Sequence, residues 1–311
     1  MLAAMDDPQV GMEIGGFFGG AAREIRERMR ESREARDRGE RTTREECFTS
    51  ELLHWFRGSI RRQVEELSSE LRRLGTRVDV EFWPTDLPVS EEVEYGADLG
   101  IRLRIRTPEL ILVKGVLVQC KKMDGEAGRP TFSELRGRGE EQAGRMLRVT
   151  PASLFFLFNF GDQQDLIDMT SVPIGTVCPV PDGAIPASKR RAIGTNCPYW
   201  AHSDGGIWDL GVAVLPAARV LALSAGSVRS RTPLPIDARQ ILRGCLPLGV
   251  FMVDLFSSCF VGDMREEVVR LVTPPGERNL WIPERGLAPE HLAGFAVRQY
   301  LTIDVNGERP R

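Results

Sequence analysis

The chain has 311 residues, six cysteines and a formal net charge of −3 at pH 7. No apolar run approaches the roughly 20 residues of a membrane-spanning helix, so the sequence predicts a protein that does not cross a membrane. The cysteines lack CxxC spacing and no basic, apolar leader is visible, which favours reduced thiols in a cytoplasmic protein over a secreted disulfide framework.

The N-terminal segment divides into two parts. Residues 10–22 (VGMEIGGFFGGAA) are glycine-rich and apolar, which predicts a poor helix and favours a disordered terminus, with a flexible arm or partner-binding tail as the alternative. Residues 23–44 mix arginine and glutamate at helical spacings such as Glu24–Arg28, which predicts a solvated charged helix. Residues 1–46 are therefore expected to form an arm and a charged helix.

The first strong helical pattern covers residues 49–74. Thr43 and Glu46, just before it, have the spacing of a capping box. Apolar residues at spacings of three and four predict one buried face: Phe48, Leu52, Trp55, Phe56, Ile60, Val64 and Leu67. Glu51 falls beside this stripe, so its carboxylate is a candidate to face a functional site.

Three strand patterns follow, at residues 77–82, 96–105 and 110–121. In the second, apolar side chains occupy every other position: Leu99, Ile101, Leu103 and Ile105. Arg102 and Arg104 lie on the opposite face, which is typical of a half-buried strand. The third pattern (LILVKGVLV) predicts a central strand buried on both faces. Residues 107–109 supply a turn, so the last two strands are expected to form an antiparallel hairpin.

Polar side chains gather at one end of this predicted hairpin. Asp98 opens the second strand, and Gln119 and Lys121 close the third on one face, with Cys120 opposite. A carboxylate and a backbone carbonyl near Cys120 can bind a divalent cation, and a lysine can steady an attacking water or a charged phosphate. These parts predict a centre for metal-dependent cleavage of phosphodiesters.

Beyond the hairpin, residues 132–147 predict a helix that carries Gln142, and residues 153–160 predict a fourth strand. Because the net charge is acidic, contacts to phosphate must come from local basic patches. The candidates are Arg102, Arg104, Lys114, Lys121, Lys122, Arg129, Arg136 and Arg138.

The remaining sequence changes character. Residues 171–203, rich in proline and glycine, are interpreted as a long excursion or linker. Apolar or helical patterns return at residues 209–223, 247–260, 264–272 and 287–300. An aromatic cluster includes Trp200 and Trp208 near His202; a nucleobase can stack on such rings, but packing under a loop is the favoured interpretation. Cys178, Cys197 and His202 lack the paired spacing of zinc ligands.

The order of these elements, with Gly-Ala-Asp opening the hairpin and Val-Gln-Cys-Lys closing it, resembles the restriction-endonuclease-like nucleases, the PD-(D/E)xK superfamily. It is similar to the variant in which glutamine replaces the middle acidic residue (D…QxK). The resemblance covers residues 47–160 and implies an α/β fold with a core of helix, three strands, helix and strand. We expect residues 47–165 to form this core and residues 166–311 an α+β C-terminal region of unknown role.

The resemblance implies a role for each matching residue. Asp98 matches the metal-binding aspartate, Lys121 matches the lysine, and Gln119 stands where many members carry Asp or Glu. The implied metal is Mg²⁺ or Mn²⁺, held by Asp98, the backbone carbonyl near Cys120 and Glu51.

Two further positions follow from the same resemblance. Many members carry a glutamate on the first helix that approaches the metal, and Glu51 fits that position, with Glu94 as a competitor. Gln142 matches a position where related nucleases often have a glutamine near the site.

We therefore expect a cytoplasmic, metal-dependent endonuclease that hydrolyses DNA, by analogy in restriction or anti-phage defence. A homodimer is expected, and an activating ligand or partner protein is left open, as is RNA in place of DNA. The alternative is a catalytically inactive module of the same fold that binds nucleic acid or a partner protein. Its basis is the neutral Gln119, which leaves fewer anionic ligands than Mg²⁺ prefers.

Overall fold

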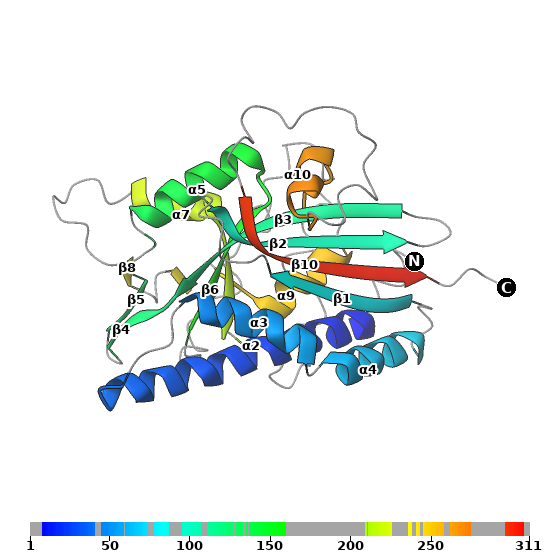
Figure 1. Ribbon diagram of the computed structural model, residues 1–311, viewed down its shortest axis with the longest axis horizontal. Helices are drawn as coiled ribbons and strands as arrows, with labels where there is room; N and C mark the ends of the chain where they lie inside the picture. Colours follow the sequence, from blue (N-terminus) through cyan, green and yellow to red (C-terminus); the bar gives the residue numbers. More distant parts are fainter. Residues whose placement is uncertain are drawn as a thin grey trace.

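A mixed seven-stranded sheet runs through the protein, seen here in a computed structural model (Figure 1). The structure describes residues 8–40, 45–58, 60–73, 78–86, 95–106, 111–126, 129–132, 135, 137–159, 209, 211–225, 236–237, 241–242, 245–257, 262–274 and 296–307. The strand order is β1 (Val78–Asp86), β10 (Ala296–Gly307), β2 (Tyr95–Arg106), β3 (Ile111–Lys122), β6 (Ser153–Phe158), β7 (Val212–Pro216) and β9 (Leu246–Pro247).

Most neighbouring strands of this sheet are antiparallel, but β10 runs parallel to β2 and β6 runs parallel to β3. A separate small sheet joins β4 (Asp124–Glu126), β5 (Arg129–Phe132) and β8 (Ile236–Asp237). The predicted α/β class is confirmed. No helix in the described part of the chain is long and apolar enough to span a membrane.

Helices cover both faces of the sheet, as Figure 1 shows. On one side lie α2 (Pro8–Asp37), α3 (Glu45–Gly58), α4 (Ile60–Arg73) and α9 (Leu248–Ser257). On the other side lie α5 (Arg138–Val149), α7 (Ala217–Ala225) and α10 (Glu266–Leu271). The core is therefore a three-layer arrangement in which the central strands have no solvated face.

Along the chain, α3–α4, β1, β2, β3, α5 and β6 follow the predicted order of helix, three strands, helix and strand, with β4 and β5 between β3 and α5. In the sheet, β10 separates β1 from β2, a departure from the predicted core. The helix predicted at residues 132–147 begins later than expected. Phe132 still belongs to β5, and α5 starts at Arg138 after Gly137, whose φ of 62° lies in the left-handed region that glycine adopts without strain.

The prediction of disorder for residues 10–22 is wrong, because they lie within the 30-residue helix α2. Its buried residues recur at helical spacings: Ile14, Phe18, Ala21, Ala22, Ile25 and Met29. Gly20 faces α3, and a Cβ there would make ordinary van der Waals contact with the Trp55 ring at 3.5 Å. Packing of an amphipathic face thus outweighs the poor helix propensity of the glycines.

The C-terminal strand β10 also differs from expectation. A helix was predicted over residues 287–300, yet residues 296–300 lie in β10, between β1 and β2. Short apolar runs do not distinguish helix from strand by spacing alone, and here two strand edges provide the partners. The predicted division at residues 46 and 165 stays a prediction; strands from both sides of residue 165 are hydrogen-bonded neighbours in one sheet.

Strand β2 is buried on both faces rather than half-buried. Its apolar face is fully covered, as predicted, but Arg102 on the other face is only 2% exposed. Val272 is part of the cover on that side. A Cβ added at Gly100 would lie 3.2 Å from Val272, and a Cβ added at Gly115 would lie 2.7 Å from it. Glycine at both positions makes room for the chain segment after α10.

Candidate functional site

Asp98 and Gln119 meet across the β2–β3 hairpin, as predicted. The antiparallel register pairs Leu99 with Val118, so the next pair outward is Asp98 with Gln119, and directly opposed side chains share a face. The Gln119 side-chain amide, through Nε2, donates a hydrogen bond to Asp98 Oδ2. The same carboxylate oxygen accepts the backbone N–H of Cys120 at 2.9 Å. Asp98 is thereby held in one orientation by two donors from β3.

Lys121 lies on the same face as Gln119, two residues further along β3. Both side chains are only 2% exposed. Cys120 lies between them and points to the opposite face, where its thiol is buried. Its backbone N–H binds Asp98, while the expected role of its carbonyl stays a prediction. The structure therefore brings Asp98, Gln119 and Lys121 together on one covered face.

One oxygen at this cluster has unused hydrogen-bonding capacity. Gln119 Oε1 is buried, and it finds no hydrogen-bond partner within the described residues. A buried acceptor left unsatisfied costs about 1–3 kcal/mol, so such an atom beside a carboxylate indicates a position where a donor, a water or a cation binds.

Gln142 lies on α5, which packs against β2 and β6 on the opposite side of the sheet from α3. Its Oε1 is likewise buried and unsatisfied among the residues that the structure describes. The structure thus places Gln142 in the layer that covers Asp98, and its contact with the site stays a prediction.

Glu51 lies on the other side of the sheet. Its neighbour Ser50 accepts a hydrogen bond from Gln299 Nε2 at 3.0 Å, and Gln299 pairs with Leu99, whose side chain points away from the Asp98 face. Burial raises the pKa of Glu51 above its usual range, and the positive charge of Arg28 only partly opposes this. The structure therefore sets Glu51 among charges of α2 rather than beside Asp98.

Comparisons with protein-family models, curated proteins and solved structures found no match. Several predicted residues lie outside the described part of the chain: Glu94, Arg136, Cys178, Cys197, Trp200, His202 and Trp208.

The chemistry of the donors decides whether a divalent cation fits this cluster. Asp98 and Gln119 Oε1 offer a carboxylate and an amide oxygen, the hard ligands that Mg²⁺ accepts. Across the residues that the structure describes, no group of three or more His, Cys, Asp or Glu side chains could hold a metal ion. A cation at this cluster would have two protein oxygen donors and would have to take its remaining ligands from water and substrate.

A line of charged side chains continues along the same face of β2, and only part of it is predictable from the sequence. Arg102 donates from Nη1 to Thr273 Oγ1 at 3.1 Å, and Arg104 forms a two-point ion pair with Asp304, with Nε–Oδ1 at 2.7 Å. Burial, followed by repulsion from Arg104, lowers the pKa of Arg106 from its usual value. Asp304 was missed because no local pattern links it to a residue 200 positions away.

Proposed function

We propose that the protein is a metal-dependent nuclease whose centre is the cluster of Asp98, Gln119 and Lys121. The observation that carries the proposal is the hydrogen-bonded pair of Asp98 and Gln119, with a buried, unsatisfied amide oxygen and a buried lysine on the same face. The order of helices and strands around the hairpin supports it, since it follows the order of a restriction-endonuclease-like core.

Each residue has a defined task in this proposal. Asp98 and the amide oxygen of Gln119 would hold a divalent cation, which when bound polarises a phosphoryl oxygen and lowers the pKa of bound water. The Gln119 NH₂ group and the Cys120 N–H keep the Asp98 carboxylate aimed. Lys121 supplies a positive charge for the phosphate in a site of low dielectric, where it stabilises developing negative charge more strongly than in water.

The substrate proposed is DNA, with restriction or anti-phage defence as the biological setting. That setting rests on fold-level analogy, because the geometry of a site specifies chemistry and not biological context. Cleavage of both strands by a homodimer is part of the same proposal.

Adjacent lysines of β3 make a matched test. Lys121 lies on the Asp98 face, whereas the Lys122 ammonium lies 5.8 Å from the centre of the Phe48 ring on the α3 side. Plasmid cleavage should be measured with Mg²⁺ and with Mn²⁺ for Asp98→Asn, Lys121→Met and Lys122→Met. Loss of about 10²–10³-fold in rate is expected for the first two, the range for removing a group that stabilises transition-state charge.

The control in this test is Lys122→Met, which should cleave like the wild type. Asp98→Asn keeps an oxygen that can accept from Cys120 N–H, so its melting temperature should stay close to that of the wild type. Equal activity of Asp98→Asn and the wild type would refute the site.

One observation favours a second candidate, a non-catalytic module that binds nucleic acid or a partner protein. Asp98 Oδ2 already accepts two hydrogen bonds from β3, an arrangement that also suits a purely structural carboxylate. Titration with Mn²⁺ separates the two functions. A nuclease centre predicts binding that Asp98→Asn weakens, whereas a structural carboxylate predicts the same weak binding in both proteins.

A further inference from the structure

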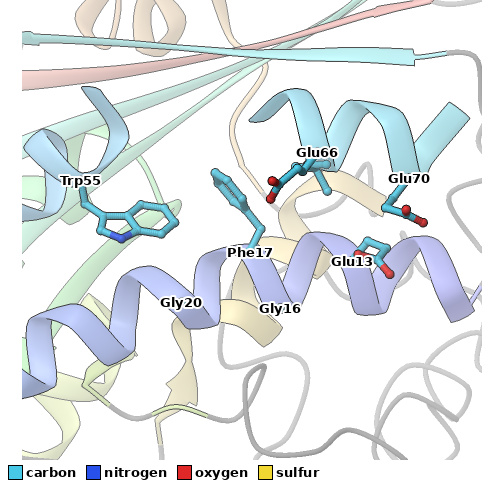
Figure 2. Close-up of a pocket in the computed structure, with 8 residues that line it drawn as sticks. Glu13, Gly16, Phe17, Gly20, Trp55, Glu66 and Glu70 are labelled. Atoms are coloured by element: carbon cyan, nitrogen blue, oxygen red, sulfur yellow. The ribbon is translucent and has the colours of Figure 1, made fainter. Parts of the chain in front are cut away.

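A groove opens between α2, α3 and α4, on the helical layer that contains Glu51 and away from the Asp98 cluster (Figure 2). Its volume is about 500 Å³, within the range of sites that bind small ligands. Gly16 and Gly20 of α2 form part of its wall, and a Cβ at Gly16 would meet nothing within 4 Å. The hollow therefore exists because α2 lacks side chains there.

The walls of this groove combine aromatic rings with carboxylates. Phe17 and Trp55 pack edge to face with their centroids 5.2 Å apart. In Figure 2, Phe17 stands between Trp55 and Glu66, and Glu13 and Glu70 lie beyond. A ligand in this space would meet aromatic rings at one end and negative charge at the other.

The described residues that line the groove include three carboxylates and no basic side chain. These are Glu13, Glu66 and Glu70; Arg73 pairs with Glu70 at 2.6 Å, and Glu66 likewise interacts with another group of the chain, with which a ligand would compete. This ion pair is largely exposed, and exposed pairs hold their partners weakly, so a ligand ammonium can compete for Glu70. Aromatic faces attract cations as well, and the two features together favour an organic cation over a neutral or anionic ligand.

The spacing of the carboxylates indicates which organic cation. Glu66 and Glu70 are four residues apart on α4, so they lie on one side of the helix about 6 Å apart along its axis. The ammonium groups of an aliphatic polyamine repeat at a similar spacing, with apolar methylene groups between them. An inorganic divalent cation instead needs oxygen ligands gathered around one point.

We propose that this groove binds an aliphatic polyamine. Its ammonium groups pair with Glu66, Glu70 and Glu13, and its methylene chain lies along Phe17 and the bare surface at Gly16. This site lies in a different layer from the Asp98 cluster. The polyamine proposal is therefore independent of the proposed nuclease activity.

The test is a calorimetric titration of the full chain with spermidine. The wild type should bind one spermidine, and Glu66→Gln with Glu70→Gln should weaken binding at least tenfold. Gly16→Leu should abolish binding by filling the hollow, with an unchanged circular dichroism spectrum. Glu65→Gln is the matched control, because Glu65 is exposed on the same helix and does not line the groove, and it should bind like the wild type.

Several outcomes would overturn the proposal. These are an absence of heat with wild-type protein, binding that Gly16→Leu leaves intact, or an equal loss in Glu65→Gln. Hexane-1,6-diol, which has a similar chain without charge, should not bind, and saturable binding of the diol would identify an apolar site instead. Displacement of spermidine by equimolar Mg²⁺ would identify a site for inorganic cations.

Discussion

The two faces of the β2–β3 hairpin are buried to a similar degree but by different chemistry. On the α3 side the covered residues are almost all apolar, with Leu99, Ile101 and Val118 as examples. On the α10 side the covered residues include Asp98, Arg102, Gln119 and Lys121, of which Asp98 is half-buried. Burial stabilises an apolar face whichever apolar groups cover it, because the hydrophobic effect is non-directional. A buried polar face is stable only when each polar group forms a hydrogen bond or an ion pair.

This difference separates the roles of the two faces. The side chains of the apolar face could be replaced by other apolar side chains of similar volume with little loss of stability. The polar face depends on specific partners drawn from β3, from the segment after α10 and from β10. Substitutions on the apolar face should therefore affect only the stability of the fold. On the polar face, the loss of stability should depend on which partner is removed.

The largest effect is expected from shortening a core side chain of the apolar face. Ile101 is 1% exposed, so Ile101→Ala should lower the free energy of unfolding by about 2–5 kcal/mol, through lost burial and the cavity left behind. Urea denaturation followed by circular dichroism measures this change. Ile101→Val is the matched control, with an expected loss of about 0.5–1.5 kcal/mol. A loss as small for alanine as for valine would mean that this face is loosely packed.

An intermediate effect is expected from breaking the ion pair on the polar face. Asp304→Leu leaves the Arg104 guanidinium without the carboxylate that binds it at two points, and should cost about 2–3 kcal/mol, below the range for a fully buried pair because Arg104 is partly exposed. Adding Arg104→Met should recover much of that loss, since two apolar side chains replace a desolvated pair. Additive losses in the double variant, measured in the same denaturation series, would contradict a coupled pair.

The smallest effect concerns the pH dependence of Glu51. Because burial raises its pKa in the folded protein, the folded state holds this proton more tightly than the unfolded chain does. Stability is therefore lost as pH rises from about 4, the usual range of a glutamate, through the raised pKa. Glu51→Gln should remove this loss, so its urea midpoint should exceed that of the wild type at pH 7 and converge with it at acid pH.

The control for this measurement is Glu141→Gln, at an exposed position on α5, which should follow the wild type at every pH. A Glu51→Gln midpoint that falls below the wild type at neutral pH would instead show that the Glu51 carboxylate stabilises the fold through Arg28.

Local sequence patterns predicted the β2–β3 hairpin, because its strands and register depend on residues close together in the chain. The alternation in β2 and the apolar run in β3 fixed the hairpin, and the hairpin register in turn placed Asp98 against Gln119. The burial of Arg102 could not be predicted, because its cover comes from residues near Thr273. Periodicity identified the buried stripe of α3, but it does not show which face of the sheet the helix covers. The position of Glu51 relative to Asp98 therefore could not be predicted.

The helix α2 and the strand β10 are two elements whose conformation the local sequence did not predict. Glycines at positions 16 and 20 argue against a helix locally, and only packing against other helices makes α2 stable. The pattern of β10 becomes a strand because β1 and β2 present free edges on either side of it. In both cases distant contacts decided between conformations that the local sequence left close in energy.

The position of β10 between β1 and β2 has a consequence for folding during synthesis. Arg104 and its partner Asp304 are 200 residues apart, so at 5–20 residues per second the ribosome needs about 10–40 seconds to supply the missing strand. Until then β1 and β2 lack the strand that joins them, and each leaves an unpaired edge that can associate with other chains. The centre of this sheet can close only late in translation, and until β10 is made the edges of β1 and β2 stay available for pairing with other chains.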